Sequence, residues 1–99
     1  MNANEKFETG EMTLSSRVNF KAVSNPMFEE RLYLYIGRYI NCDWGDVNEA
    51  DSKANDKAVK DGYGRIVAVY RDYATGTDEV MIVTEPDRSM TTIMFPDEY

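Results

Sequence analysis

The stretch DWGDVNEAD places four carboxylates within nine residues, beside the chain's single tryptophan, Trp44; they are Asp43, Asp46, Glu49 and Asp51. Carboxylates at close spacing suit hard cations such as Ca²⁺. A calcium loop, however, needs oxygen ligands at alternating positions, a glycine turn among them and a late bidentate glutamate. Here the intervals are three, three and two, and Gly45 precedes most of the acids. The stretch is therefore a poor match to a calcium loop.

A helix start explains at least two of these acids. Either Asp46 or Asn48 can cap a helix, and Glu49 and Asp51 would then lie in its first turn, where the helix dipole favours anions. Asp43 and any acid that the cap does not use are left over. Tryptophan is most often a core or hinge residue, but it is also enriched at binding hot spots. We predict a first contact region for a partner, formed by Asp43, Trp44, Asp46, Glu49 and Asp51.

The chain has no histidine, and this excludes most hydrolytic chemistry. Ser-His-Asp and Cys-His arrangements and imidazole-bound zinc all require that side chain. The single cysteine, Cys42, allows no internal disulfide and no CxxC site. We therefore expect a protein that is not an enzyme and has no cofactor and no metal site. An enzyme that uses Asp/Glu and a divalent metal is the remaining catalytic alternative.

Composition restricts the partner and the compartment. The 99-residue chain carries 18 acidic and 11 basic residues, for a net charge of −7, and no basic stripe that could follow a phosphate backbone. There is no signal-peptide core and no apolar run of the ~20 residues that a membrane span needs. We predict a cytoplasmic protein that contacts neither nucleic acid nor membrane directly.

The hydrophobic spacing predicts two helices. Residues 1–10 are polar and are expected to be a flexible N-terminus, followed by a single domain over 11–99. Residues 11–24 fit a short strand and a helical turn. A helix should run from Pro26 to about Asn41, capped by Asn25. Its apolar stripe consists of Phe28, Leu32, Tyr35, Ile36 and Tyr39. A second helix, 47–60, should bury Val47, Ala50, Ala54 and Ala58, and should end at Gly62 or Gly64.

Three strands should follow, over 65–71, 79–85 and 90–95, with a hairpin loop over 72–78 and Pro96 ending the last strand. The predicted order is β-α-α-β-β-β. This indicates an α+β fold in which two helices pack on one face of an antiparallel sheet of three to four strands. The strands at 65–71 and 79–85 are apolar on both faces, so a second copy of the chain is also a candidate partner.

Several motifs bear a resemblance to a known family. Asp43-Trp44-Gly45, Asn55, Gly64-Arg65-Ile66 and TEPDRSMTTIMFPDEY, residues 84–99, resemble a family of small proteins carried on plasmids, phages and other mobile elements. Its members are often labelled plasmid-related protein or type I restriction enzyme subunit M. Where that family tends to have glycine before Asp-Trp-Gly, this chain has Cys42. A methyltransferase subunit is excluded here, because the chain has no room for a cofactor-binding Rossmann unit and no glycine-rich fingerprint.

The resemblance implies residence on a mobile element, and proteins of this size and acidity from such elements resemble anti-CRISPR or anti-restriction proteins. We therefore expect an inhibitor of a host defence nuclease, with a Cas9-type effector as first choice, that blocks its guide- or target-binding surface. A restriction-enzyme inhibitor that imitates DNA charge and a plasmid maintenance module without a nuclease partner are the alternatives. Two further contact regions are predicted: Glu85, Asp87 and Arg88, and then Asp97, Glu98 and Tyr99.

Overall fold

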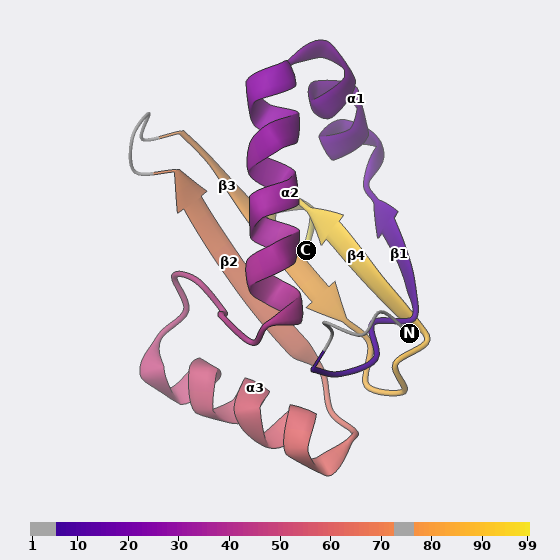
Figure 1. The fold of residues 1–99 in the computed structure, drawn as a ribbon, viewed down its shortest axis with the longest axis vertical. Coiled ribbons are helices and arrows are strands. Elements are labelled where there is room, and N and C mark those ends of the chain that lie inside the picture. Colours follow the sequence, from indigo (N-terminus) through magenta and orange to yellow (C-terminus); the bar gives the residue numbers. More distant parts are fainter. Residues whose placement is uncertain (1–5, 73–76) are drawn as a thin grey trace.

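The computed structural model describes residues 6–72 and 77–99. They form an α+β fold in which helices pack on a four-stranded sheet (Figure 1). The predicted order is confirmed, with one additional helix. The elements are β1 (Glu11–Leu14), α1 (Ser16–Ser24), α2 (Pro26–Ile40), α3 (Glu49–Asp61), β2 (Ile66–Asp72), β3 (Thr77–Thr84), β4 (Met90–Met94) and the 3-10 turn η1 (Pro96–Glu98).

The additional helix is α1, which extends the predicted helical turn to nine residues. The side chain of Ser15 caps it by accepting a hydrogen bond from the backbone N–H of Val18. Asn25 caps α2 in the same way, and Pro26 occupies the first turn, both as predicted. The helices of residues 6–72 and 77–99 include none that is long and apolar enough to cross a membrane.

The sheet is mixed, with the strand order β1-β4-β3-β2. The pairs β2–β3 and β3–β4 are antiparallel, as predicted, but β1 runs parallel to β4. The reason is topological. The two strands come from opposite ends of the chain, with the helices and the other two strands between them. No hairpin turn joins them and forces an antiparallel arrangement.

The core lies between α2 and the sheet, and α2 crosses the sheet in Figure 1. The predicted stripe of α2 is confirmed at four buried positions and at the half-buried Ile36. The Tyr35 ring of α2 stacks on the Tyr70 ring of β2, with 5.1 Å between the ring centroids. On the sheet, the buried side chains that share this core are Ile66, Ala68, Tyr70, Val80, Ile82 and Ile93.

Residues 6–10, the described half of the predicted N-terminal segment 1–10, pack on the domain. Phe7 and Thr9 are only 7% and 6% exposed. The centroid of the Phe7 ring lies 5.4 Å from that of Tyr39 and 5.8 Å from that of Trp44. The Thr9 carbonyl accepts a hydrogen bond from the Thr91 hydroxyl. Phe7 and Thr9 together anchor this stretch to the domain. Residues 1–5, and residues 73–76 of the predicted hairpin loop, lie outside the described part of the chain.

Helix α3 ends as predicted at Gly62, which has φ +72°. Its buried face, however, differs from the predicted alanine face. Ala50 and Ala54 are exposed, whereas Asn55 and Ala58 are buried. The physical reason is that α3 packs beside β2 and not over the apolar face of the sheet, so its contact is with the backbone of an edge strand (Figure 1).

Candidate partner-binding surfaces

Asp43, the first acid of the opening stretch, is paired within the chain. One carboxylate oxygen accepts from Arg38 Nε at 2.7 Å, and the other accepts from Arg38 Nη2 at 3.2 Å and from the Gly45 N–H at 3.1 Å. The hydrogen bonds from the Arg38 guanidinium hold the pKa of Asp43 below its usual value. About half of the side chain remains exposed, so a partner would compete with Arg38 for it.

Trp44, which was predicted in the first contact region, lies in the core. Only 4% of its surface is exposed, and its ring packs against Phe7 and Tyr39. The indole N–H donates to Asp56 Oδ1 at 2.9 Å. This single polar contact satisfies the one donor of the indole, so the rest of the ring can be buried. The hot-spot preference of tryptophan is therefore not used at this position.

Residues Trp44 to Asp46 run along the outer edge of β2. The Val69 N–H donates to the Trp44 carbonyl at 3.3 Å, the Asp46 N–H donates to the Val69 carbonyl at 2.6 Å, and the Arg71 N–H donates to Asp46 Oδ2 at 2.9 Å. Gly45 is required here. Its φ is +74°, and a Cβ would lie 2.2 Å from the Val69 carbonyl oxygen. Asp46 therefore serves the fold.

Asn55 completes the cover of this edge. Its side-chain amide donates to the Val67 carbonyl at 2.8 Å and accepts from the Val67 N–H at 3.1 Å. An edge strand with free backbone groups is a template for unwanted pairing, and here five successive groups of β2 are occupied by the chain itself. The resemblance includes both Asp-Trp-Gly and Asn55, and both have this structural role.

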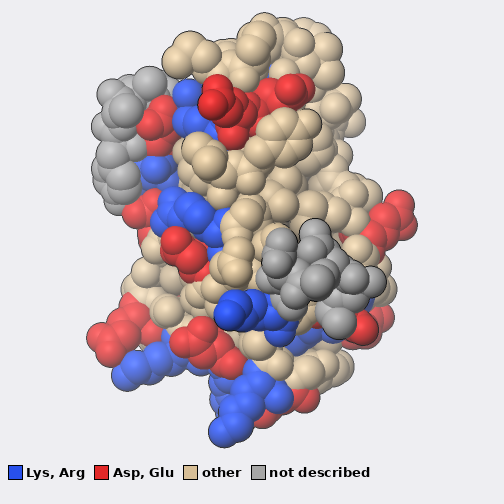
Figure 2. All heavy atoms as spheres, viewed as in Figure 1, with Lys and Arg blue, Asp and Glu red and all other residues tan. Residues whose placement is uncertain are grey.

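Glu49 and Asp51 lie in the first turn of α3, with Asn48 as the cap, which decides between the two predicted caps. Glu49 pairs with Lys53 at 3.1 Å on the exposed side of the helix. Around α3, at the bottom of the view in Figure 2, Lys and Arg alternate with Asp and Glu. The acids of the first predicted region therefore do not form an unbroken negative patch on this face.

Arg88, in the second predicted region, holds two parts of the fold together. It has φ +63°, and its guanidinium donates to the Gly64 carbonyl at 2.6 Å and to the Ala58 carbonyl at 2.8 Å. These bonds tie the β3–β4 turn to the end of α3. Arginine forms several such bonds because its donors are fixed in a planar fork. Arg88 therefore stabilises the fold.

Glu85 and Asp87 are the more accessible members of this region. Glu85 pairs with Arg65 at 3.4 Å, and Asp87 Oδ1 accepts from the Ser89 N–H at 3.0 Å. The hydrogen bonds with Ser89 lower the pKa of Asp87. The two acids line an open depression of about 370 Å³ beside the exposed Tyr63. This depression is the one place where the second predicted region offers a surface.

The third predicted region folds back on the domain. Asp97 pairs with Arg17 at 2.9 Å. Glu98 Oε2 accepts from the Ser15 hydroxyl at 2.9 Å and from the Phe95 N–H at 2.7 Å. Tyr99 is 61% exposed, and its hydroxyl accepts from Arg65 at 3.4 Å. The three residues thus fix the C-terminal turn, and Asp97 and Tyr99 remain open to solvent.

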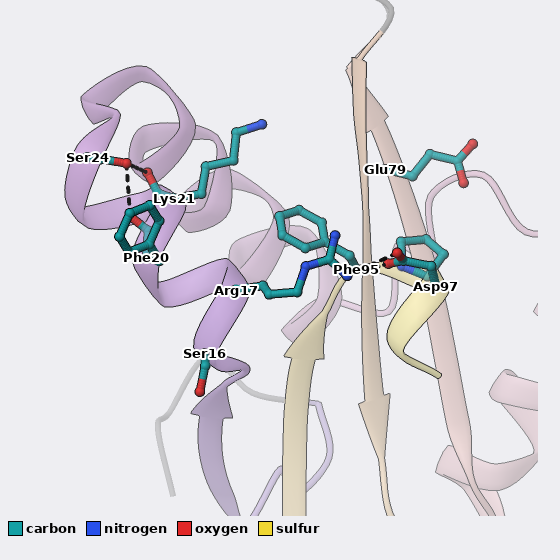
Figure 3. A pocket seen from close by; sticks show the side chains of 9 residues that line it. Ser16, Arg17, Phe20, Lys21, Ser24, Glu79, Phe95 and Asp97 are labelled. Carbon is teal, nitrogen blue, oxygen red and sulfur yellow. Dashed lines mark hydrogen bonds and ion pairs between the residues drawn. The ribbon is translucent and has the colours of Figure 1, made fainter.

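Asp97 also lines an open groove of about 790 Å³ between α1 and the C-terminal turn (Figure 3). Here the Arg17 guanidinium lies over the Phe95 ring, 5.1 Å from its centroid. Phe20 is 77% exposed at the α1 side of the groove. The groove, which we call the C-terminal groove, is lined by Ser16, Arg17, Phe20, Lys21, Ser24, Glu79, Phe95, Pro96 and Asp97.

Large apolar side chains are exposed on α1 and α2, and the sequence reasoning did not single them out. This set, the helical apolar surface, consists of Phe20, Val23, Met27, Tyr33 and Leu34, each at least 63% exposed. Phe20 belongs also to the groove. In Figure 2 the area over α1 and α2 is mostly uncharged, with a few acidic side chains within it. The signal in the sequence was that Met27 and Leu34, seven residues apart, form a second apolar side of α2 outside its core stripe.

No group of three or more His, Cys, Asp or Glu side chains within residues 6–72 and 77–99 is arranged to hold a metal ion. No family model, no curated protein and no solved structure matches the chain. The features that bear on function are therefore the surfaces described above and the net charge of −7.

Proposed function

We propose that this chain is a non-enzymatic binding protein that inhibits a host defence nuclease, with a Cas9-type effector as first candidate. It docks through the helical apolar surface and the adjoining C-terminal groove, and it blocks the surface on which the nuclease holds its guide or target strand. The observation that carries the proposal is the exposure of five large apolar side chains on α1 and α2.

Exposed apolar side chains that gather on one part of a small domain mark an interaction site, because leaving them in water is unfavourable. Phe20 is the best candidate for an anchor. It is an aromatic residue, 77% exposed, at the boundary between an apolar surface and a groove that carries Arg17 and Asp97. Interfaces commonly combine such an anchor with a polar rim.

The net charge of −7 supports a nuclease as the partner. Nucleases of this kind hold nucleic acid in strongly basic channels, and a negative domain is attracted to them at long range. Direct nucleic-acid binding by this chain is disfavoured for the same reason. Because lysines are interspersed among the acids around α3, we favour attachment through apolar contacts, with charge contributing to the encounter, over imitation of DNA charge.

The test is binding to purified nucleases, a Cas9-type effector and a restriction enzyme, followed by cleavage assays. Phe20→Ser should weaken binding and inhibition by about 10-fold or more, as for a hot-spot aromatic residue. Tyr63→Ser is the matched control, because Tyr63 is 68% exposed but lies beside the depression of Glu85 and Asp87. It should leave binding unchanged.

Two results would contradict the proposal. Absence of binding to every nuclease would remove the assigned function, and plaque or transformation assays that do not depend on host defence would then favour a maintenance module. Equal loss in the Phe20 and Tyr63 variants would remove the assigned surface while leaving the function.

A further inference from the structure

The outer edge of β1 has backbone groups that no described residue contacts. β1 lies at one edge of the sheet, with β4 as its neighbour (Figure 1). The N–H groups of Glu11 and Ser15 donate to β4-side carbonyls of Ser89 and Ile93 at 3.1 and 2.9 Å. Because backbone groups alternate in direction along a strand, those of Thr13 also face β4. The N–H and C=O groups of Met12 and Leu14 therefore point outward.

The two edges of this sheet are treated differently. The edge of β2 is occupied by Trp44, Asp46 and Asn55, as described above. The devices that usually protect a free edge are a very short strand, charged side chains, proline, a bulge or a covering element. β1, EMTL, is four residues long and carries one charge, Glu11, but it has neither lysine nor proline, and its register with β4 is regular over all four residues. An edge kept open beside one that is closed indicates a place for another strand.

We propose that this strand is β1 of a second copy of the chain, paired antiparallel about a two-fold axis at Thr13. In this register Met12 lies opposite Leu14 of the second copy. Both residues have outward N–H and C=O groups, so each of the two Met12–Leu14 pairs exchanges two hydrogen bonds. The result is four new backbone hydrogen bonds and one continuous sheet of eight strands, four from each copy. The proposal does not depend on the proposed function.

The side chains are compatible with this self-pairing. Met12 and Leu14 are in register with the buried Thr91 and Ile93, so they lie on the helix-covered face of the sheet. A two-fold axis perpendicular to the sheet preserves this face, and the half-exposed Leu14 would extend the apolar layer from one copy to the next. Glu11 faces Ser15 of the second copy and not another carboxylate, so no like charges oppose each other.

Cysteine cross-linking tests the register directly. In a Cys42→Ser background, Thr13→Cys places two thiols across the axis. There the Cα atoms of a non-hydrogen-bonded pair lie about 4.5 Å apart, within the range that a disulfide spans. Glu11→Cys is the matched control on the same strand. In the paired strands, the Glu11 positions of the two copies are four residues apart, about 13 Å, a distance that no disulfide bridges. Under mild oxidation, Thr13→Cys should give a covalent dimer and Glu11→Cys should not.

Mass in solution provides the second measurement. The unmodified chain should show a concentration-dependent mass that rises toward twice 11.4 kDa in light scattering or sedimentation. Leu14→Pro should remain monomeric, because it removes an outward N–H and leaves the ladder to β4 intact. A cooperative thermal unfolding transition will show whether the Leu14→Pro variant is folded. A monomeric unmodified chain at every soluble concentration would overturn the proposal. So would cross-linking that is equal in the two cysteine variants, or a folded Leu14→Pro variant that still dimerises.

Discussion

Cys42 occupies a backbone conformation that residues with a side chain rarely adopt, with φ +65°. It closes the turn after α2, where its N–H donates to the Tyr39 carbonyl at 3.0 Å. Glycine would adopt this conformation without a steric cost, because it has no Cβ.

We therefore predict that Cys42→Gly is more stable than Cys42→Ala by about 1 kcal/mol, the cost of a left-handed conformation for a residue with a Cβ. Both variants lose the same partly buried thiol, so comparing them separates the backbone from packing. Urea unfolding of the two variants measures the difference. An alanine variant as stable as the glycine variant would mean that the turn relaxes to negative φ.

Asp43 makes the stability of the fold depend on pH. Its pKa is lowered by the hydrogen bonds from Arg38, so the unfolded chain takes up the proton at a higher pH than the folded one. The stabilisation is therefore complete above the unfolded pKa of about 3.9 and is lost as the pH falls through the folded pKa. Because half of the side chain is exposed, the contribution should be small.

Asp43→Asn should thus lower the free energy of unfolding by about 0.5 kcal/mol at pH 7, a value typical of an exposed pair. As the pH falls through the folded pKa of Asp43, the stabilities of the variant and the parent should converge. Thermal unfolding across this pH range measures the effect, and Arg38→Gln should give a similar profile. If the free energy of unfolding of Asp43→Asn stayed below that of the parent by the same amount from neutral to acid pH, the side chain would act through its shape and not through its charge.

At the scale of elements, α3 and the preceding loop are held to the sheet mainly through the edge of β2. Asn55 is 4% exposed and satisfies both backbone groups of Val67. Asn55→Ala would leave a buried N–H and a buried C=O without their partner. Each such group costs about 1–3 kcal/mol, so a loss of about 3 kcal/mol is expected in urea unfolding.

Asn48→Ala is the control for this prediction, because it lies on the same helix but removes only the N-terminal cap. It should cost about 1 kcal/mol. If the two variants lost equal stability, the contact with the edge of β2 would contribute no more than an ordinary helix cap.

The elements also show what the sequence could predict. Local signals were reliable: Asn25 and Gly62 bound their helices as predicted, and the stripe of α2 is buried. The partner of the Trp44 indole and the buried face of α3 were not predicted. They depend on hydrogen bonds of Trp44 to Asp56 and of Asn55 to Val67, each pair 12 residues apart, and hydrophobic periodicity carries no information about such contacts. Asn55 in an alanine-rich helix was a signal, since a buried amide needs a partner.

At the scale of the whole molecule, two of the predicted contact acids and the helical apolar surface lie on different elements. Glu49 and Asp51 lie in the first turn of α3, whereas the helical apolar surface lies on α1 and α2 (Figure 1). If the chain binds a basic nuclease as proposed, the two should act on different steps. Long-range charge changes the rate of encounter, and desolvated apolar contacts set the lifetime of the complex.

We therefore predict opposite kinetic signatures for two matched variants. The double reversal Glu49→Lys and Asp51→Lys should lower the association rate several-fold at low salt, and the difference should fade as salt screens the charges. Leu34→Ser should leave association unchanged and raise the dissociation rate about 10-fold, at every salt concentration, because a well-packed apolar contact is worth about 1.4 kcal/mol or more. Surface plasmon resonance over a salt series measures both rates. A charge reversal that shortens the lifetime of the complex as much as Leu34→Ser would place α3 inside the interface, and the contact surface would then have to include the acids themselves.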